Sequence, residues 1–246
     1  MLPRFYAPEL DPSSPGLTLP ADEARHASRV LRLSVGDAVA VFDGRGTEFR
    51  AVIETAARDV VTLRLVERTP APPSPAVRIV VAQAVLKGGS MDDAVRDATM
   101  LGAEAIEPLL TAHTDVKPAL AMRPATIERW RRIALASTKQ SRRATLPAVH
   151  EPRTFDAWMR QPSAEMVLMF VEPSAATEAR ALRDSVNHIV PPRVAVLLGP
   201  EGGWAVEELE AAKAAGCRMV TLGPLTLRAE SMAVAALAAL TAIWER

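Results

Sequence analysis

The residue pattern most suggestive of chemistry is LLGPEGGW at positions 197–204, two leucines that run into a Gly-Pro-Glu-Gly-Gly turn. Glycines lack a Cβ, so their backbone amides can approach a bound molecule closely. The turn has no lysine of the P-loop kind, and its glycines do not follow the G-x-G-x-x-G spacing of dinucleotide folds. The pattern therefore indicates a ligand-binding turn that is neither of these phosphate loops.

Two other segments have the same character, FVEPS at 170–174 and LGPLTLRAES at 222–231. Each follows an apolar run, and ligands of open α/β sheets bind at the carboxyl ends of strands. Leu225 and Leu227 stand in a loop that should be polar, which predicts that they line a pocket or pack under another loop. The alternative from the residues alone is three tight strand-to-helix turns without a ligand.

A second candidate chemistry is nucleic-acid binding. Between Arg123 and Arg143 the chain has seven Lys or Arg residues and one acid, Glu128. Phosphate contacts dominate affinity for RNA, and such a segment supplies them. A further basic stripe is predicted on a helix over 20–33, where an ordinary solvated face is an equally good interpretation. The stripe consists of Arg25, Arg29 and Arg32 at i, i+4 and i+7.

Strands and helices must alternate after residue 77 to bring these segments together. Apolar runs predict strands at 77–85, 103–110, 165–172, 193–199 and 217–223, with helices at 90–102, 126–140, 178–188, 205–216 and 229–246. This order predicts an α/β domain with a mostly parallel sheet over 77–246.

The N-terminal part has a different pattern. Short β-favouring runs surround the Asp43-Gly44 turn, which predicts a small β-barrel over 1–70. Four prolines fall between Pro70 and Pro75, so residues 71–76 are predicted to form an extended linker.

Composition excludes several classes of protein. Twenty-nine basic residues balance 29 acidic ones, so only local charge favours RNA. One cysteine (Cys217) and four histidines without ligand spacing argue against a disulfide framework and a metal centre, and fit a reducing compartment. The N-terminus does not resemble a signal peptide, and the apolar run at 232–244 is too short to span a bilayer. We expect a cytoplasmic protein with no membrane and no metal partner.

Several motifs in register resemble one family, the bacterial 16S ribosomal RNA (uracil-N3)-methyltransferases of the SPOUT superfamily. The resemblance covers essentially the whole chain. It includes RFY (4–6), HASRVLRLSVGDAVAVFDGRGTEF (26–49), AQAVLKGGSMDDAVRDATMLGAEAIEPL (82–109), RWRRIALASTKQSRRATLPAV (129–149), the Gly-Pro-Glu-Gly-Gly turn and LGPLTLRAESMAVAAL (222–237).

This resemblance implies an N-terminal PUA-like β-barrel followed by an α/β domain with a deep trefoil knot. It also implies a homodimer and S-adenosylmethionine as the cofactor, bound among the three loops. The cofactor-binding residues that it implies are Glu172, Leu198, Gly199, Pro200, Glu201, Gly202, Gly203, Leu222, Gly223 and Leu227.

Methyl transfer to N3 of uridine makes one chemical demand. The N3 lone pair is unavailable until a weakly acidic proton leaves, so a base, or a cation that stabilises the charge on O2 and O4, would help. Arg228 is our candidate for charge stabilisation or substrate anchoring. Glu230 would orient Arg228 or accept the proton, although a first-turn glutamate is usually only a partner of the helix dipole.

The implied substrate is 16S rRNA in the small ribosomal subunit, with uridine 1498 as the family target. Gln140 and Arg142 lie in QSRR, which matches the family's Q-S-x-R element, and Lys87 matches the lysine of its LKG motif. The complete set of RNA-binding candidates is Arg4, Arg25, Arg29, Arg32, Lys87, Arg132, Gln140, Arg142 and Arg143.

Departures from the family pattern leave alternatives open. Leu225 and Thr226 replace an arginine and an isoleucine, Lys139 replaces a glutamate, and His113 replaces an arginine. Other replaced positions are Met100 and Ser231-Met232. The alternatives are a non-catalytic RNA-binding SPOUT homologue and a SPOUT methyltransferase that acts on another RNA position. A ribose 2′-O-methyltransferase is disfavoured because the one asparagine, Asn187, is far from the expected motif, and nucleotide hydrolysis lacks its lysine.

Overall fold

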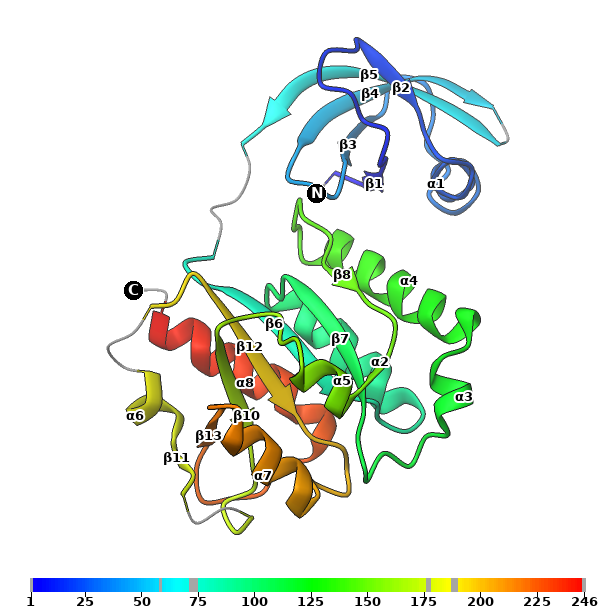
Figure 1. Ribbon diagram of the computed structural model, residues 1–246. Helices are drawn as coiled ribbons and strands as arrows, with labels where there is room; N and C mark the ends of the chain where they lie inside the picture. The colour runs from blue at the N-terminus through cyan, green and yellow to red at the C-terminus, as the bar shows by residue number, and fades with distance from the viewer. Residues whose placement is uncertain (1, 58, 71–74, 176–177, 187–189, 245–246) are drawn as a thin grey trace. The chain divides into compact units, whose positions relative to one another are not determined.

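The structure is a computed structural model that describes residues 2–57, 59–70, 75–175, 178–186 and 190–244. It divides into two compact units (Figure 1). The first comprises residues 1–73 and 138–146, and the second comprises 74–137 and 147–246. Linker residues 71–74 and Asn187 lie outside the described part of the chain.

The first unit is built on one five-stranded sheet, in agreement with the predicted β-rich N-terminal fold. Its strands are β1 (Arg4–Tyr6), β2 (Gly16–Thr18), β3 (Ala38–Phe42), β4 (Glu48–Ala57) and β5 (Val60–Thr69), in the order β1-β3-β4-β5-β2. Alternate residues such as Val39 and Val41, Ala51 and Ile53 are buried in a single apolar core, as expected for strands with one face covered.

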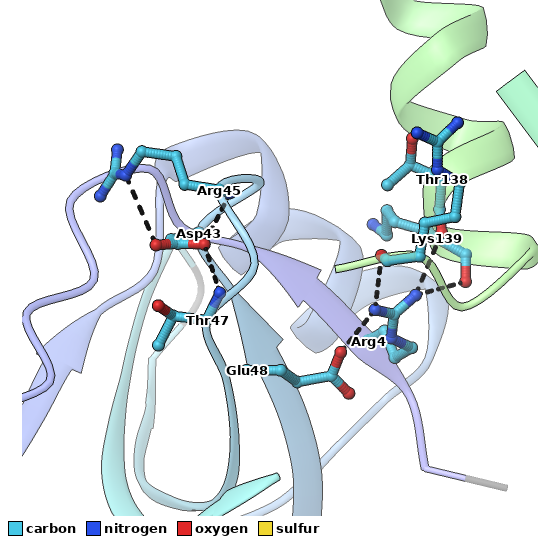
Figure 2. A network of polar contacts seen from close by, with 8 residues as sticks. Arg4, Asp43, Arg45, Thr47, Glu48, Thr138 and Lys139 are labelled. Carbon is cyan, nitrogen blue, oxygen red and sulfur yellow. Dashed lines mark hydrogen bonds and ion pairs between the residues drawn. The ribbon is translucent and has the colours of Figure 1, made fainter. Parts of the chain in front are cut away.

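The β3–β4 hairpin turns where the sequence predicted. Asp43 Oδ1 accepts hydrogen bonds from the amides of Arg45 (2.7 Å) and Thr47 (3.0 Å), and Figure 2 shows this turn. Gly44 and Gly46 have φ of 74° and 109°, which glycine adopts without strain. Local residues thus explain the shape of the turn, and main-chain hydrogen bonds between Gly46 and Ala144 and between Leu146 and Gly44 hold it against residues 144–146.

The predicted helix over 20–33 is shorter and irregular. An α-helix, α1 (Ala21–Arg25), continues into a π-helix, η1 (His26–Val30), and Arg32 lies beyond it with φ of 53°. The π-turn changes the residue period, so the i, i+4, i+7 spacing does not form one continuous helical stripe. Arg25, Arg29 and Arg32 are nevertheless all exposed.

Residues 138–146, which follow most of helix α4 (Pro124–Gln140), pack with the first unit. Arg4 holds this segment: it donates to the carbonyl oxygens of Thr138 (3.1 Å), Lys139 (3.0 Å) and Arg143 (2.9 Å). Its guanidinium also pairs with Glu48 at 2.6 Å, as Figure 2 shows. The side chain is only 8% exposed, so we assign Arg4 to anchoring this segment rather than to RNA.

A second buried ion pair fixes the same segment. Lys139 Nζ lies 2.8 Å from Glu23 Oε2, and Glu23 is 5% exposed. Burial raises the pKa of Glu23 above its usual value, and the hydrogen bond and positive charge of Lys139 oppose this shift. The lysine that departs from the family pattern therefore has a structural partner in α1.

The second unit contains a mostly parallel sheet, and this prediction is confirmed. Its strands occur in the order β11-β13-β10-β12-β6-β7-β8, with β9 also paired to β7, and these neighbours are paired in parallel in the described part of the chain. The strands are β6 (Arg78–Ala84), β7 (Ala105–Leu110), β8 (Ala148–Val149), β9 (Arg153–Thr154), β10 (Met166–Phe170), β11 (Arg180–Ala181), β12 (Arg193–Leu198) and β13 (Arg218–Thr221).

Helices cover the sheet of the second unit on both faces. Helices α5 and α7 share an apolar cluster with alternate residues of the central strands, such as Val80 and Ala82. Helix α8 packs against β6, β12 and α2. The helices of this unit are α2 (Gly89–Met100), α3 (Pro118–Ala121), α4 up to residue 137, α5 (Phe155–Met159), α6 (Leu182–Val186), α7 (Val206–Ala214) and α8 (Ala229–Trp244).

The strand order positions the three predicted loops. Strands β13, β10 and β12 are adjacent and parallel, so their carboxyl ends meet at one edge of the sheet. The trefoil threading of the chain in this region stays a prediction. Among the described residues, no helix is both long enough and apolar enough to cross a bilayer.

Candidate functional site

One cavity of about 660 Å³ lies where strands β10, β12 and β13 end. Its wall is formed by residues 170–173, 175, 199–204, 222–223 and 225–230, together with Ser90 and Met232. The volume falls within the range of small-molecule sites, and the place is the one that open α/β sheets use for ligands. The three loops predicted from the sequence are thus brought together at one site.

Trp204 joins two of these loops. Its indole Nε1 donates to the carbonyl oxygen of Phe170 at 2.9 Å, which ties the loop after β12 to the end of β10. Its ring also lies 5.6 Å from the ring of Phe155, centroid to centroid. A Cβ added at Gly199 would come within 3.1 Å of this indole nitrogen, so Gly199 leaves the space that the tryptophan occupies.

We expect Gly199→Ala to weaken binding of the site's ligand about tenfold or more, because the new methyl group displaces an indole that positions two loops. Titration calorimetry with S-adenosylmethionine would measure this. Gly216→Ala is the matched control. Gly216 has φ of 80° and no atom within 4 Å of an added Cβ, so it tests backbone strain outside the cavity. Equal affinities of the two variants would contradict the prediction.

A second tether connects the Gly-Pro-Glu-Gly-Gly turn to the loop after β7. His113 Nδ1 lies 3.0 Å from the carbonyl oxygen of Gly202 and 3.2 Å from that of Gly203. The buried carboxylate of Glu208 accepts from the amides of Ala112 (2.9 Å) and Ala205 (3.0 Å), so it caps α7 and holds the same loop. Segments about ninety residues apart are therefore linked at the site.

Glu201 ties the glycine turn to the loop after β6. Its Oε1 accepts a hydrogen bond from the amide of Lys87 at 3.0 Å. The Lys87 ammonium pairs with Asp115, and this pair raises the pKa of the lysine. Lys87 does not line the cavity among its described wall residues.

Two glycines in the wall adopt backbone conformations that other residues rarely adopt. Gly203 (φ 69°) and Gly223 (φ 141°) have positive φ, and a Cβ added at either would meet no other atom within 4 Å. Apolar side chains stand beside them, namely Leu222, Leu225, Leu227 and Met232. This wall suits a ligand with a flat apolar part and polar groups that reach main-chain donors.

The cavity also has a charged side. Arg228 is 87% exposed at its side chain, and its Nη1 lies 3.8 Å from Glu230 Oε1 in the first turn of α8. Glu172 and Glu201 provide two further carboxylates in the wall. An exposed guanidinium at the edge of an apolar cavity can meet an anionic group of a ligand or substrate.

The remaining sequence candidates are Leu198, predicted to bind the cofactor, and the residues predicted to bind RNA. Leu198 is fully buried within β12, so its side chain belongs to the core and the cavity wall begins at Gly199. Gln140, Arg142 and Arg143 belong to the first unit, together with Arg25, Arg29 and Arg32, whereas Arg132 and Lys87 belong to the second.

Helix α4 carries less net charge than its sequence suggests. Arg129 pairs with Asp92, Arg131 pairs with Glu128 at 2.6 Å, and Lys139 pairs with Glu23. Asp92 and Glu23, which lie on other helices, therefore offset two charges of the basic run in addition to the one offset by Glu128. Arg132 and Arg142 are exposed, and neither forms an ion pair with an acid among the described residues, so they are the better RNA candidates.

Sequence reasoning missed several residues of the site. Trp204, Ser90 and Met232 were not chosen, and the hydrogen bonds of His113 and Glu208 were not foreseen. Trp204 directly follows the glycine turn, so its position was the one available signal. The contacts of His113 depend on how β7 and β12 lie in the sheet, which no local pattern shows.

The single cysteine is not an activated nucleophile. Burial raises the pKa of Cys217 from 9.0 to about 11. At pH 8 we expect its thiolate fraction, and hence its alkylation by iodoacetamide, to be about 100-fold lower than for an unperturbed thiol. The same chain unfolded in urea provides the control, with labelling followed by mass spectrometry. Equal labelling rates in the folded and unfolded chains would show the prediction to be wrong.

Comparison with known families gives two matches. An RNA methyltransferase domain matches residues 72–241, and an RNA methyltransferase PUA domain matches residues 19–66. The methyltransferase match spans most of the second unit and also includes residues 138–146, whereas the PUA match lies within the first unit.

Individual relatives agree with the family matches. The chain is 33% identical over 232 residues to ribosomal RNA small subunit methyltransferase E of Synechocystis, covering 93% of this chain and 74% of the relative. It is 32% identical to the protein of the same name from Mycobacterium bovis, covering 98% and 93%. The crystal structure of ribosomal RNA small subunit methyltransferase E from Neisseria gonorrhoeae, bound to S-adenosyl methionine, superposes with a TM-score of 0.88 at 27% identity, covering 99% of this chain and 98% of that one.

Proposed function

This chain belongs to the RNA methyltransferase family, and on that basis we propose that it methylates 16S rRNA of the small ribosomal subunit, with S-adenosylmethionine as methyl donor. We further propose N3 of uridine 1498 as the methylated atom. A ribosomal substrate is consistent with a cytoplasmic protein.

The observation that carries the proposal is the single cavity at the ends of β10, β12 and β13. The glycine turn, the Leu222–Gly223 segment and Arg228 all line it. These are elements whose motifs resemble the family, and they come from two separate parts of the sequence, residues 199–203 and 222–231. Because they meet in one cavity of suitable volume, the resemblance concerns a site as well as a fold.

The residues present suit S-adenosylmethionine. Gly203 and Gly223 leave space where any other residue would place a Cβ, so main-chain groups of residues 199–203 and 222–223 can face the cofactor. Leu222, Leu227 and Met232 offer apolar contacts to an adenine ring, and Glu172 offers a carboxylate to polar groups of the cofactor. When bound, the cofactor supplies a methyl group on a positively charged sulfur.

The contribution of the protein is to align the uridine and to favour loss of its N3 proton. An activated methyl group needs little further activation, so positioning of the nucleophile is the main task. We propose that Arg228 stabilises the negative charge that develops on O2 and O4 when the proton leaves. Glu230, 3.8 Å away, keeps Arg228 at the cavity or accepts the proton.

RNA would be bound by exposed cations on both units. Arg25, Arg29 and Arg32 on the first unit and Arg132 on the second are exposed, and Arg142 is exposed with φ of 62°. Contacts of this kind act mainly on phosphates, so they contribute affinity rather than selection of one uridine. Lys87, Gln140 and Arg143 complete the proposed set.

We propose that the protein acts as a homodimer. Large apolar side chains are exposed at the second unit, including Leu225 (78%), Val206 (65%) and Val234 (39%). Exposed apolar side chains of this size can be covered by a second copy of the chain. Light scattering after size-exclusion chromatography would give the mass, and a monomer at micromolar concentration would contradict this part of the proposal.

The function is tested with small ribosomal subunits from a strain that lacks the modification. The subunits are incubated with the protein and S-adenosylmethionine, and digested RNA is analysed for 3-methyluridine by mass spectrometry. Appearance of 3-methyluridine at position 1498 is the expected result. Another methylated position would change the substrate, and cofactor binding without methylation would favour a non-catalytic RNA-binding homologue.

A further inference from the structure

We propose that His113 is a positioning residue for the cofactor: it fixes the peptide groups of Gly202 and Gly203 so that the glycine turn is ordered before a ligand arrives. This inference rests on the proposed function for the identity of the ligand, but its structural part concerns the protein alone. His113 is not among the described residues that line the cavity, so it would act through the turn.

The hydrogen bonds define what the imidazole does. Carbonyl oxygens only accept, so His113 Nδ1 must carry a proton to bind the oxygens of Gly202 (3.0 Å) and Gly203 (3.2 Å). One donor is shared between two consecutive carbonyls. In a planar trans peptide the N–H points opposite to the C=O. With the Gly203 carbonyl turned toward His113, the amide of Trp204 is therefore directed to the opposite side of the turn.

The position of His113 is itself fixed by neighbouring contacts. The amide of the preceding residue, Ala112, donates to the buried carboxylate of Glu208 at 2.9 Å. Glu208 also caps helix α7, which begins two residues after Trp204. The loop after β7 and the start of α7 are therefore joined at Glu208, and the hydrogen bonds of His113 connect the glycine turn to this support.

Close packing supports the same conclusion. A Cβ added at Gly202 would lie 3.0 Å from His113 Cβ and 3.4 Å from its carbonyl oxygen. The turn thus approaches the His113 backbone as closely as a glycine permits. The internal hydrogen bond from the Gly203 amide to the Pro200 carbonyl (3.0 Å) closes the turn on itself, and His113 provides the outside contact to its Gly202 and Gly203 carbonyls.

Two substitutions separate the donor from the size of the side chain. In His113→Asn, the amide nitrogen takes the place of Nδ1 and can donate to the same carbonyls. In His113→Gln, the nitrogen lies one bond farther out, near the place of Nε2, and cannot reach them in the same geometry. His113→Ala removes the donor altogether.

Hydrogen exchange of the ligand-free protein tests the structural part directly. We expect peptides covering residues 199–205 to exchange about tenfold faster in His113→Ala and His113→Gln, and at nearly the wild-type rate in His113→Asn. Peptides from β6 and α2 should be unchanged, which would show that the fold is intact. Unchanged exchange in His113→Ala, or equally fast exchange in Asn and Gln variants, would overturn the inference.

Calorimetric titration with S-adenosylmethionine tests the consequence for binding. The dissociation constant should rise about tenfold in the Ala and Gln variants and about threefold or less in the Asn variant. Wild-type affinity in all three would overturn the inference while leaving the proposed function in place. If the wild-type protein does not bind S-adenosylmethionine, the proposed function and the binding part of this inference both fail.

Discussion

Replacement of Arg228 by alanine is expected to lower the rate of 3-methyluridine formation by about 10²–10³-fold, with little change in affinity for S-adenosylmethionine. Loss of one preorganised donor to a developing oxyanion has an effect of this size in other enzymes. Arg228 is 87% exposed, and its ion pair with Glu230 spans 3.8 Å, so its removal should leave the fold intact. Single-turnover methylation of small subunits, followed by mass spectrometry, gives the rate.

Arg96→Ala is the control for this experiment. Arg96 is also an exposed arginine of the second unit, paired with Asp93 and Asp97 on the surface of α2, and it does not line the cavity in the described structure. We expect its variant to keep the wild-type rate.

The pH dependence shows how Arg228 acts. A higher pH increases the fraction of uridine that has lost its N3 proton. If Arg228 stabilises that anion, the ratio of the wild-type rate to the Arg228→Ala rate should therefore fall as the pH rises. A deficit that stays constant with pH would assign Arg228 to anchoring the RNA instead. Wild-type rates in the variant would remove Arg228 from the mechanism.

Replacement of Arg4 by methionine is expected to destabilise the first unit by about 3–5 kcal/mol, the usual effect of removing one member of a buried ion pair. The substitution leaves the Glu48 carboxylate without its 2.6 Å partner and leaves the carbonyls of Thr138, Lys139 and Arg143 without their donor. Figure 2 shows how Arg4 lies between Glu48 and the end of α4. Residues 138–146 should also detach from the rest of the first unit as its stability falls.

Hydrogen exchange is the appropriate measurement, because the chain has two units and need not unfold in one step. Protection in β3 and in residues 138–146 should fall by about 10²–10³-fold or more in Arg4→Met. Arg29→Met is the matched control: its pair with Asp59 is about half exposed at both side chains, so the expected effect is within about 0.5 kcal/mol. Equal effects of the two substitutions would show that Arg4 is not an anchor.

Most of the strands and longer helices of the second unit could be predicted from the sequence alone. Apolar runs of strand length separated by amphipathic segments located strands β6, β7, β10, β12 and β13 and the longer helices, because such patterns are set by local burial. Motifs in family order then indicated the ligand, and the matched domains agree with that interpretation. Short elements such as α3, α5 and β11 were missed because two to five residues carry too little periodicity.

The same local reasoning failed where a side chain's partner is distant in sequence. Arg4 and Lys139 were judged by their charge, yet the fold buries them against Glu48 and Glu23, at separations of 44 and 116 residues. The sequence does not show whether a charged side chain is buried or exposed, and only packing decides whether it contacts solvent or a carboxylate. The basic run on α4 lost part of its excess charge for this reason.

What the sequence determined by itself was the identity of the loops; what the tertiary structure decided was how they are held. The glycine turn is visible as five residues, but Trp204, His113 and Glu208 position it through atoms of Phe170, Gly202–Gly203 and Ala112. Those contacts exist because parallel strands far apart in the chain lie side by side and end at one edge. Strand adjacency is a property of the whole sheet, so no window of sequence contains it.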